Sequence, residues 1–484
     1  MSDGSNDRAV LMRCLAPLWL MLTAVAGAPS LAQSPAGDWT QFGWDVAASS
    51  APTEPTGITP SNIATLQRRR VTLDGTVDAS AIYLHSVTVK GSTHDVFVVT
   101  TTYGKTLAID ANQGSVLWEY TPAKFATWVG TRQITNSTPV ADPDRLHLYA
   151  AAPDGTIQKL ALEDGHALWT TPITRLPQRE KIASPLREFR GHIVAVTGGY
   201  IGDSPPYQGH VAILDAQSGA VRHVWNSLCS DRPDLLVPSA CRSTQSAIWG
   251  RAGAVIDAAT GNILVATGNG PYNGKTDWGD ATIELNADAT RMLGNFTTVN
   301  NADLNSSDLD IGSTSPVLLP DGLLAQGGKD GLIRLLSVQA IAGTMPHEGH
   351  EVQTVSTPSG NKLFTAPAVW HHEGETWMFV ADSGGTAAWS LRGGKLVEMW
   401  KNSNGGTSPV VAGGLLYLYD PTGQLRVYEP TTGHPVASLE CGSGHWNSPI
   451  VVNGKIALPE GNANAHAVSG VLDIWSLPTR DGET

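Results

Sequence analysis

An internal repeat restricts the fold of this chain more than any other feature, because a unit of about forty residues recurs along its length. Each copy has a Ser/Thr-Pro-Val-like start, a Gly turn, a strand ending in Asp, and a final strand that carries tryptophan. The clearest copies occupy residues 95–120, 137–169, 209–225, 407–436 and 447–461. Each expected strand alternates or is wholly apolar over a few residues, which is the pattern of β-structure.

Prolines that open the first strand of a copy set the spacing of the repeat. They are Pro139, Pro185, Pro316, Pro367, Pro409 and Pro449, and the long second interval divides near Gly250 into two similar parts. A first copy starting at residues 78–84 brings the number of units to eight. A four-stranded unit cannot bury both faces alone, but radial stacking buries them. The sequence therefore predicts an all-β fold, an eight-bladed β-propeller of four-stranded blades.

The two ends of the repeat region predict how the ring closes. Residues 66–73 precede the first unit, and residues 471–477 end the last one. Pairing these segments would remove the free edge of the ring. The alternative, an open solenoid, would need polar capping units, and the sequence shows none. We therefore expect residues 33–484 to form a single propeller domain.

The first 32 residues have the pattern of a signal peptide. Arg8 and Arg13 precede an apolar run over residues 15–28, and Ser30-Leu31-Ala32 fits a small-residue cleavage site. The apolar run is too short, and too interrupted by proline, for a membrane span. We therefore expect a periplasmic or secreted protein without a membrane span.

Cysteine usage and charge narrow the function classes further. In an oxidising compartment we expect a Cys229–Cys241 disulfide and a free Cys441. No Cys-x-x-Cys-His motif occurs, which excludes a covalently attached c-type haem.

The net charge is −13 and there is no basic stripe, so we expect no nucleic-acid partner. The basic run Arg68–Arg70 is interpreted as a solvated strand edge.

The repeat also resembles that of a known family. The stretch LAIDANQGSVLWEY (residues 107–120) is similar to the tryptophan-bearing repeat of the pyrroloquinoline quinone (PQQ) propellers, and residues 38–67 look like that family's N-terminal lead-in. The family contains eight-bladed quinoprotein alcohol dehydrogenases and non-enzymatic relatives. Because both groups share the repeat, the resemblance implies the fold more strongly than the activity.

Two positions match the family's cofactor-contacting residues. Trp249 matches the tryptophan that floors the PQQ ring, where a flat indole would stack on the tricycle. Lys329 matches the basic residue that contacts the quinone oxygens. From the residues alone, Trp249 could equally be a core tryptophan, and Lys329 could be an exposed lysine in a hairpin turn.

Three further positions match the family's metal site, which implies calcium or a lanthanide as the ion. Asn269 matches its metal-binding asparagine, Asp308 its catalytic base close to the metal, and Asp310 the second acid that accompanies lanthanide use. Alternation along an extended chain would point both acids the same way. The alternative is that Asn269 and the two acids are ordinary turn residues.

The sequence departs from the family pattern in three places. An ungapped match puts Ser204 where the family has a metal-binding glutamate, and Asp203 could replace it only with a shifted backbone. The family's adjacent-cysteine disulfide is absent. Arg132 lies near the position of the ring-contacting arginine, but not at the matching step.

Two functions therefore remain open. The first is an exported PQQ- and metal-dependent dehydrogenase that oxidises an alcohol or sugar hydroxyl and passes electrons to a separate acceptor. The second is a non-catalytic propeller that binds a protein or glycan partner. Insertions at residues 198–209, 225–245 and 268–280 could carry a binding site on one face. In the last insertion, Tyr272 and Trp278 could contact a substrate or simply pack on the blade.

Overall fold

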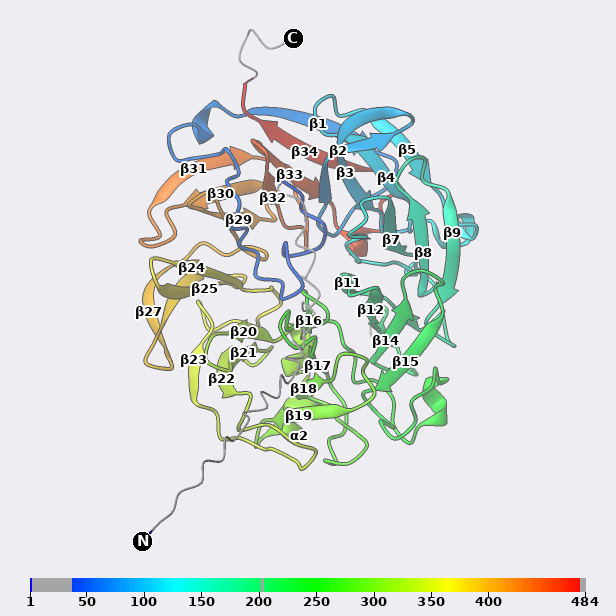
Figure 1. Cartoon of the computed structure of the whole chain (residues 1–484), viewed down its shortest axis with the longest axis vertical. Helices are drawn as coiled ribbons and strands as arrows, with labels where there is room; N and C mark the ends of the chain where they lie inside the picture. The colour runs from blue at the N-terminus through cyan, green and yellow to red at the C-terminus, as the bar shows by residue number, and fades with distance from the viewer. Residues whose placement is uncertain (2–36, 202–203, 479–484) are drawn as a thin grey trace. The chain divides into compact units, whose positions relative to one another are not determined.

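The structure is a computed structural model that describes Met1, residues 37–201 and residues 204–478. Apart from Met1, the expected signal peptide lies outside the described residues, and so does Asp203. From residue 37 onward the chain forms eight four-stranded antiparallel sheets arranged as blades around a centre (Figure 1). The predicted eight-bladed β-propeller is confirmed.

In blades 1 to 7 the strands follow chain order from the innermost to the outermost position. Blade 1 contains β2 (Ile82–Val89), β3 (Ser92–Thr100), β4 (Thr106–Asp110) and β5 (Val116–Tyr120), and blade 2 contains β6 (Val140–Ala141), β7 (His147–Ala151), β8 (Thr156–Ala161) and β9 (Ala167–Pro172). Blade 3 contains β11 (Arg187–Phe189), β12 (His192–Val196), β14 (His210–Asp215) and β15 (Val221–Asn226), and blade 4 contains β16 (Val255–Ile256), β17 (Ile263–Ala266), β18 (Ala281–Leu285) and β19 (Met292–Thr297).

Blade 5 contains β20 (Val317–Leu319), β21 (Leu323–Gly327), β22 (Leu332–Ser337) and β23 (Gln353–Ser356), and blade 6 contains β24 (Ala368–His372), β25 (Glu375–Ala381), β26 (Thr386–Arg392) and β27 (Lys395–Asn402). Blade 7 contains β28 (Val410–Ala412), β29 (Leu415–Asp420), β30 (Gln424–Tyr428) and β31 (Pro435–Glu440), and blade 8 contains β32 (Ile450–Val452), β33 (Lys455–Glu460) and β34 (Gly470–Ser476) with β1 (Gln67–Leu73). A small sheet pairs β10 (Glu180–Lys181) with β13 (Gly198–Gly199). The helices are α1 (Phe125–Trp128), α2 (Asn301–Ser306), η1 (Ile63–Thr65), η2 (Pro238–Ala240), η3 (Ile311–Ser313) and η4 (Ala463–Ala465).

The ring closes by pairing the first strand with the last. β1 runs antiparallel to β34, with Gln67 opposite Ser476 and Leu73 opposite Gly470, so the predicted closure is confirmed (Figure 1). Arg68 pairs with the fully buried carboxylate of Asp473 at 2.6 Å. The interpretation of the Arg68–Arg70 run as a solvated edge is therefore wrong for Arg68, because the acids it meets lie on β33 and β34 and are distant in sequence.

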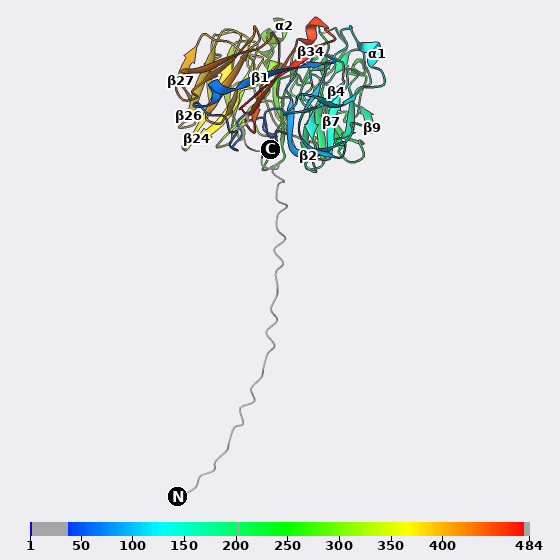
Figure 2. The ribbon, with the colours of Figure 1, turned by 90° about the horizontal axis from the view of Figure 1, so that it is seen from above.

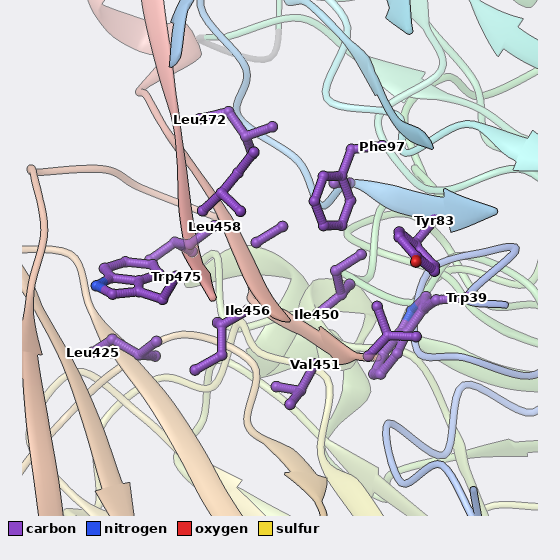
Figure 3. Packing of buried hydrophobic residues seen from close by; sticks show 14 of the residues in the cluster. Trp39, Tyr83, Phe97, Leu425, Ile450, Val451, Ile456, Leu458, Leu472 and Trp475 are labelled. Carbon is purple, nitrogen blue, oxygen red and sulfur yellow. The ribbon is translucent and has the colours of Figure 1, made fainter. Parts of the chain in front are cut away.

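An apolar cluster seals the same junction. Trp39, Tyr83 and Phe97 of blade 1, and Ile450 and Leu458 of blade 8 belong to this one cluster (Figure 3). All five side chains are at most 1% exposed. Because these residues come from both ends of the described chain, the hydrophobic gain of this cluster opposes opening of the ring.

The tryptophan in the repeat tail packs one blade onto the next. A Cβ on Gly165 of blade 2 would lie 2.5 Å from the indole of Trp118 in blade 1, and a Cβ on Gly219 of blade 3 would lie 2.6 Å from the indole of Trp169. The Trp118 Nε1–H also donates to the Leu162 carbonyl at 2.7 Å. The recurring Gly and Trp are therefore two halves of one interblade contact.

Residues 38–67, the lead-in segment, run along the inner edges of the blades. An innermost strand has one edge without a neighbouring strand, and its amides need acceptors. The amides of Ala141, Val369 and Val411 donate to lead-in carbonyls at 2.8–2.9 Å. Each donor stands two positions after the proline that opens its strand. The lead-in segment therefore contacts the innermost strands at the same position in several blades, and its carbonyls accept hydrogen bonds from their amides.

Two further predictions can be compared with the described residues. Cys229 and Cys241 form a disulfide, and Cys441 is a free thiol, as expected. Within the described part of the chain, no helix is both long and apolar enough to cross a membrane.

Candidate functional site

A cavity of about 370 Å³ lies at the centre of the ring, on the side from which the chain enters the innermost strands. Short connections that lead into these strands supply much of its wall, at residues 136, 181, 183, 247, 249, 251, 308, 310, 313, 362, 364, 445 and 446. Helices α1 and α2 lie in two such connections and stand at the same face of the propeller (Figure 2). The lead-in segment contacts the inner strands further along, past the strand-opening prolines.

Five of the site residues predicted from the sequence line this one cavity. They are Trp249, Asn269, Asp308, Asp310 and Lys329, and they come from the connections of blades 4 and 5. The sixth, Asp203, lies outside the described residues, and neighbouring Ser204 is exposed. The structure thus gathers residues that lie up to 80 positions apart in the sequence, from Trp249 to Lys329.

Lys329 is the centre of this group. Its ammonium lies 2.5 Å from Asp308 Oδ1 and 2.6 Å from Asp310 Oδ1, and 5.1 Å from the centre of the Trp249 ring. Only 10% of the lysine side chain is exposed. Burial alone would lower the pKa of Lys329, but the two carboxylates raise it above its usual value. The alternative of an exposed hairpin lysine is wrong.

Asp308 and Asp310 both contact the Lys329 ammonium, but the backbone is not extended at both of them, although the sequence predicted that it would be. Asp308 has a left-handed backbone (φ +53°) directly after α2, whereas Asp310 is extended. The Asp308 side chain is 65% exposed, and that of Asp310 is 1% exposed. The premise of an extended chain is therefore wrong, although both acids do converge on Lys329.

The environments of the two acids push their pKa values in opposite directions. Burial acts to raise the pKa of Asp308, but hydrogen bonds from Lys329 and Asn269 hold it below its ordinary value. Burial dominates for Asp310 and raises its pKa, although Lys329 and the Trp249 Nε1–H, 3.2 Å from its Oδ2, oppose the rise. Asp308 is thus held ionised and accessible, and Asp310 is enclosed.

A third acid beneath this pair was missed by sequence reasoning. Asp280, just before β18, is 1% exposed, and neither carboxylate oxygen has a well-formed hydrogen bond to the described residues. Burial, followed by the nearby charge of Asp310, raises the pKa of Asp280 to about 8. Asn269, Asp280, Asp308, Asp310 and Lys329 are called the acidic cluster below, because three carboxyl groups lie near one ammonium, which is ion-paired to Asp308 and Asp310.

Asn269 completes the acidic cluster. Its Nδ2 donates to Asp308 Oδ1 at 2.8 Å, while its buried Oδ1 has no hydrogen-bond partner in the described part of the chain. The backbone around it is tightly packed: a Cβ on Gly312 would lie 2.4 Å from the carbonyl carbon of Thr267. Glycine at position 312 therefore lets η3 approach the end of β17, which brings Asp310 close to Asn269.

A row of aromatic rings crosses the cavity. The ring centres of Trp249 and Phe364 are 6.0 Å apart, those of Phe364 and Trp446 are 5.6 Å apart, and those of Trp446 and His445 are 4.4 Å apart. Trp249 is only partly buried, so the alternative of a core tryptophan is wrong. The row offers an apolar surface to a flat ligand.

A second polar group surrounds Asp78, which lies ahead of blade 1. Its carboxylate accepts hydrogen bonds from His445 Nδ1 at 2.8 Å, Asn136 Nδ2 at 3.1 Å and the amides of Trp446 and Ala463. Burial would raise the pKa of Asp78, but His445 and Arg251 keep it below its ordinary value.

Lys181 and Arg251 connect to this group. The Lys181 ammonium donates to Asn136 Oδ1 at 3.1 Å, and an Arg251 Nη2–H donates to the Asp78 carbonyl at 3.3 Å. Burial lowers the pKa of the Arg251 guanidinium to about 10, and Asp78 opposes this fall. Asp78, Asn136, Lys181, Arg251 and His445 are called the Asp78 cluster below.

A sequence signal for the missed residues does exist. Asn136, Phe364 and Trp446 each stand three positions before a strand-opening proline, at 139, 367 and 449. His445 and Lys181 lie one position further ahead of their prolines. Since each innermost strand begins beside the cavity, the residues just before it face the centre, and aligning the copies on proline would have pointed to them.

Two other candidates lie outside the cavity wall. Tyr272 and Trp278 pack edge to face at 5.6 Å, and Tyr272 donates its hydroxyl hydrogen to Asn295 Oδ1 at 3.0 Å. Tyr272 and Trp278 therefore pack on blade 4, which was the alternative to substrate contact.

In the described part of the chain, Asp142, Asp144 and His147 form a separate group whose potential ligand atoms lie within 4.8 Å of one another.

Comparison with known proteins supports the fold. Residues 61–267 match the family model described as outer membrane protein assembly factor BamB, and no curated protein sequence matches the chain. The quinohemoprotein alcohol dehydrogenase of Pseudomonas putida HK5 has a TM-score of 0.70 at 14% identity, over 94% of this chain and 83% of that one. A europium-containing methanol dehydrogenase has a TM-score of 0.67 at 14% identity, over 92% and 99%.

A BamB structure from Moraxella catarrhalis is also similar, with a TM-score of 0.54 at 13% identity over 86% of this chain and all of that one. The recognition of a PQQ-type eight-bladed propeller from the repeat is confirmed. Identities this low show a shared fold, and the fold is common to alcohol dehydrogenases and an assembly factor.

Proposed function

We propose that this chain is an exported quinone-dependent dehydrogenase that oxidises an alcohol or sugar hydroxyl, with PQQ bound over Trp249 and a calcium or lanthanide ion beside Asp308. The convergence of Trp249, Asn269, Asp308, Asp310 and Lys329 on one central cavity is the observation that supports this most strongly. The structural similarity to alcohol dehydrogenases is consistent with it.

The cavity suits a flat, anionic cofactor. The partly buried Trp249 ring provides a stacking surface, and the Lys329 ammonium lies 5.1 Å from the centre of that ring. A cation placed there can stabilise negative charge on oxygens of a stacked ligand. When bound, PQQ would supply the two-electron acceptor, and a separate redox partner would take the electrons on.

The acidic cluster also suits a hard cation. Calcium and lanthanides prefer carboxylate and amide oxygens. Asn269 offers an amide oxygen without a partner among the described residues, beside the carboxylates of Asp308 and Asp310. Asp280 adds a third acid beneath them, so a cation would relieve the excess of carboxyl groups over the single ammonium.

Asp308 is the proposed general base. Its carboxylate is accessible and is held ionised by Lys329 and Asn269, so it can accept the proton of a substrate hydroxyl. Asp310 is enclosed and bonded to Trp249, which suits an orienting role.

The test combines binding and turnover. The purified protein is titrated with PQQ in the presence of calcium or lanthanum while quinone absorbance and tryptophan fluorescence are followed. Asp308→Ala should keep PQQ binding but lower dye-linked alcohol oxidation by about a hundredfold or more. Glu373→Ala, on an exposed turn of blade 6, is the matched control and should change neither property. No binding at saturating PQQ and metal would contradict the proposal.

A binding scaffold is the second candidate. The observation in its favour is that Lys329 already neutralises Asp308 and Asp310 by direct ion pairs, so this part of the cavity is stable without an added cation. The match of residues 61–267 to the BamB model agrees with such a role. A scaffold would bind a protein or glycan partner whether or not PQQ is present.

A further inference from the structure

A second cavity, of about 300 Å³, lies between blades 1 and 2. Tyr120 at the end of β5 supplies the wall from blade 1, and Gln158 of β8 and Thr170 of β9 supply the wall from blade 2. Trp128 of α1 borders it. Among the described residues, none lines both this cavity and the central one. The cavity is called the interblade pocket below, and its volume is at the lower end of the range for small-molecule sites.

The interblade pocket forms where the apolar contact between the two blades stops. Gln158 and Leu160 stand two positions apart on β8, so their side chains point to the same face of the sheet. Leu160 belongs to one buried apolar cluster with Trp118 of blade 1. At the next position on that face stands Gln158, and Thr170 lies directly opposite it in the ladder. Polar side chains therefore replace apolar ones at this end of the interface.

The repeat shows what this polar position does in another blade. Blade 5 carries the sequence DGLIR at residues 330–334, and blade 2 carries DGTIQ at residues 154–158. In blade 5, Arg334 forms an ion pair with Asp330, four positions before it, and both side chains are buried. The polar residue of blade 5 is thus neutralised by the acid of its own turn.

Blade 2 has the same acid but uses it differently. Asp154 accepts a hydrogen bond from the Lys124 ammonium at 3.1 Å, and this lysine directly precedes α1. Gln158 is 2% exposed, and its Oε1 has no hydrogen-bond partner in the described part of the chain. A buried amide oxygen without a partner opposes folding, so its retention in the wall of a cavity points to a ligand that completes it.

The chemistry of the wall indicates what kind of ligand fits. Lys124 and Asp154 are the only charged residues among those that the structure describes in the wall, and they pair with each other, which favours a neutral ligand. The Gln158 amide and the hydroxyls of Thr156 and Thr170 can each donate or accept a hydrogen bond. An alcohol hydroxyl does both as well, so it can pair with any of them.

The rest of the wall is apolar. Tyr120 contributes an aromatic ring, and Pro122, Pro172 and Pro177 contribute aliphatic surface. A ligand that matches the whole wall has hydroxyl groups along its edge and C–H groups on its face. The pyranose ring of a sugar has this combination, and one such ring is of the size that the cavity can hold.

We propose that the interblade pocket binds one pyranose ring of a neutral sugar. Hydroxyl groups of the ring pair with the Gln158 amide and with Thr170, and a C–H face of the ring lies against Tyr120. The inference does not rest on the proposed function, because the two cavities have separate walls. It adds a sugar-binding site to the chain whether or not the central cavity holds a quinone.

The experiment measures binding of two simple glycosides to the full chain without added PQQ or metal. Methyl β-D-glucopyranoside and methyl β-D-galactopyranoside differ in the configuration of one hydroxyl, and saturation-transfer NMR with isothermal titration follows each. We expect at least one of them to bind with a dissociation constant of about 1 mM, which is ordinary for a ligand of this size. Glycerol has hydroxyl groups but no ring face, and it should not bind.

Removal of the amide separates a binding role from a folding role. Gln158→Leu keeps the size of the side chain, and it should weaken glycoside binding about tenfold or more. Its unfolding midpoint should equal or exceed that of the wild type, because the variant no longer buries an oxygen without a partner. Gln113→Leu makes the same change at an exposed turn of blade 1 and should alter neither quantity.

Two further variants use the comparison with blade 5. Gln158→Arg places an arginine four positions after Asp154, as in blade 5, so it should fill the interblade pocket and abolish glycoside binding in a folded chain. Thr170→Val removes an exposed hydroxyl without changing the shape of the side chain, and it should weaken binding about threefold.

Each outcome supports or overturns the proposal. If neither glycoside binds to the wild type, the proposal is wrong and water alone completes the amide. If a glycoside binds equally to the wild type, Gln158→Leu and Gln158→Arg, it binds elsewhere and the proposal is also wrong. If Gln158→Leu lowers the unfolding midpoint, Thr170→Val decides, and an unchanged affinity in that variant would contradict the proposal. The PQQ titration tests the proposed function separately, so the two can fail independently.

Discussion

The acidic cluster and the Asp78 cluster flank the same cavity, yet they bury their acids differently. Asp78 is enclosed and accepts hydrogen bonds from several donors. In the acidic cluster, Asp308 is 65% exposed, and Asp280 has no well-formed hydrogen bond to any residue that the structure describes. The comparison indicates that the carboxylate of Asp78 holds blades together, whereas the acidic cluster retains groups that folding alone does not require.

The largest expected difference between the clusters is in stability. Asp78→Ala should cost about 3–5 kcal/mol, because it leaves the buried Arg251 guanidinium without its acid. Asp308→Ala should change stability by no more than about 0.5 kcal/mol, because its side chain is mostly exposed. Guanidinium chloride unfolding measures both values. Equal losses would contradict the division of roles between the clusters.

A smaller effect is expected from removing the shared ammonium. Lys329→Met should cost about 2–4 kcal/mol at neutral pH, because Asp310 is then buried without a counter-charge. The cost should decrease as the pH falls, because the pKa of Asp310 is raised and the protonated acid no longer needs the ammonium. Lys362→Met, which removes an exposed lysine of the same cavity, is the control and should leave the unfolding free energy unchanged at each pH.

The pH dependence of stability should report on Asp280. Its pKa is about 8 in the folded chain against an ordinary value of 3.8, so between these values the folded state binds more protons than the unfolded state. The free energy of unfolding should therefore decrease as pH rises through this window. Asp280→Asn should flatten that decrease and be more stable than the wild type at pH about 8, by about 1–3 kcal/mol. Identical pH profiles of the two proteins would show that Asp280 is not protonated in the fold.

The smallest expected effect is stabilisation by a cation. Lanthanum at about ten times its dissociation constant should add about 1.4 kcal/mol to the unfolding free energy. Asn269→Ala should reduce this gain, because it removes the amide oxygen that has no partner among the described residues. Asp144→Ala tests the separate group near His147 and should leave the gain unchanged if the acidic cluster binds the ion. Differential scanning calorimetry measures all three.

Much of the fold could be predicted because its signals are local and repeated. The prolines at 139 and 367 mark strand starts, and the recurring tryptophans mark final strands, as β6 and β24 and the Trp118–Gly165 contact show. Closure of the ring by residues 67–73 and 470–476 followed from the need to remove a free edge. The repeat supplies the same information eight times, so an error in one copy is corrected by the others.

The candidate site was only partly predictable, because each of its residues occurs once. Trp249 and Lys329 were found through a family resemblance, and their contact across 5.1 Å depends on the packing of blade 4 against blade 5. His445 carries only the weak signal of its spacing from Pro449, Asp280 carries none, and both were missed. Asp280 carries no local sign of burial, since a Gly-Asp step before a strand is ordinary turn chemistry.

The sequence by itself determined the blade: the alternation of its strands, the proline at its start, and the tryptophan and glycine that join it to the next. Those features act between neighbours in the chain or between consecutive copies, so pattern and spacing are enough to identify them. Only the tertiary structure decided which polar groups meet at the centre, because ring closure brings Asp78 and His445 together from opposite ends of the described chain. It also decided their charge states, because burial and counter-charges set the pKa of Asp308 and Asp280 and neither is encoded in the local sequence.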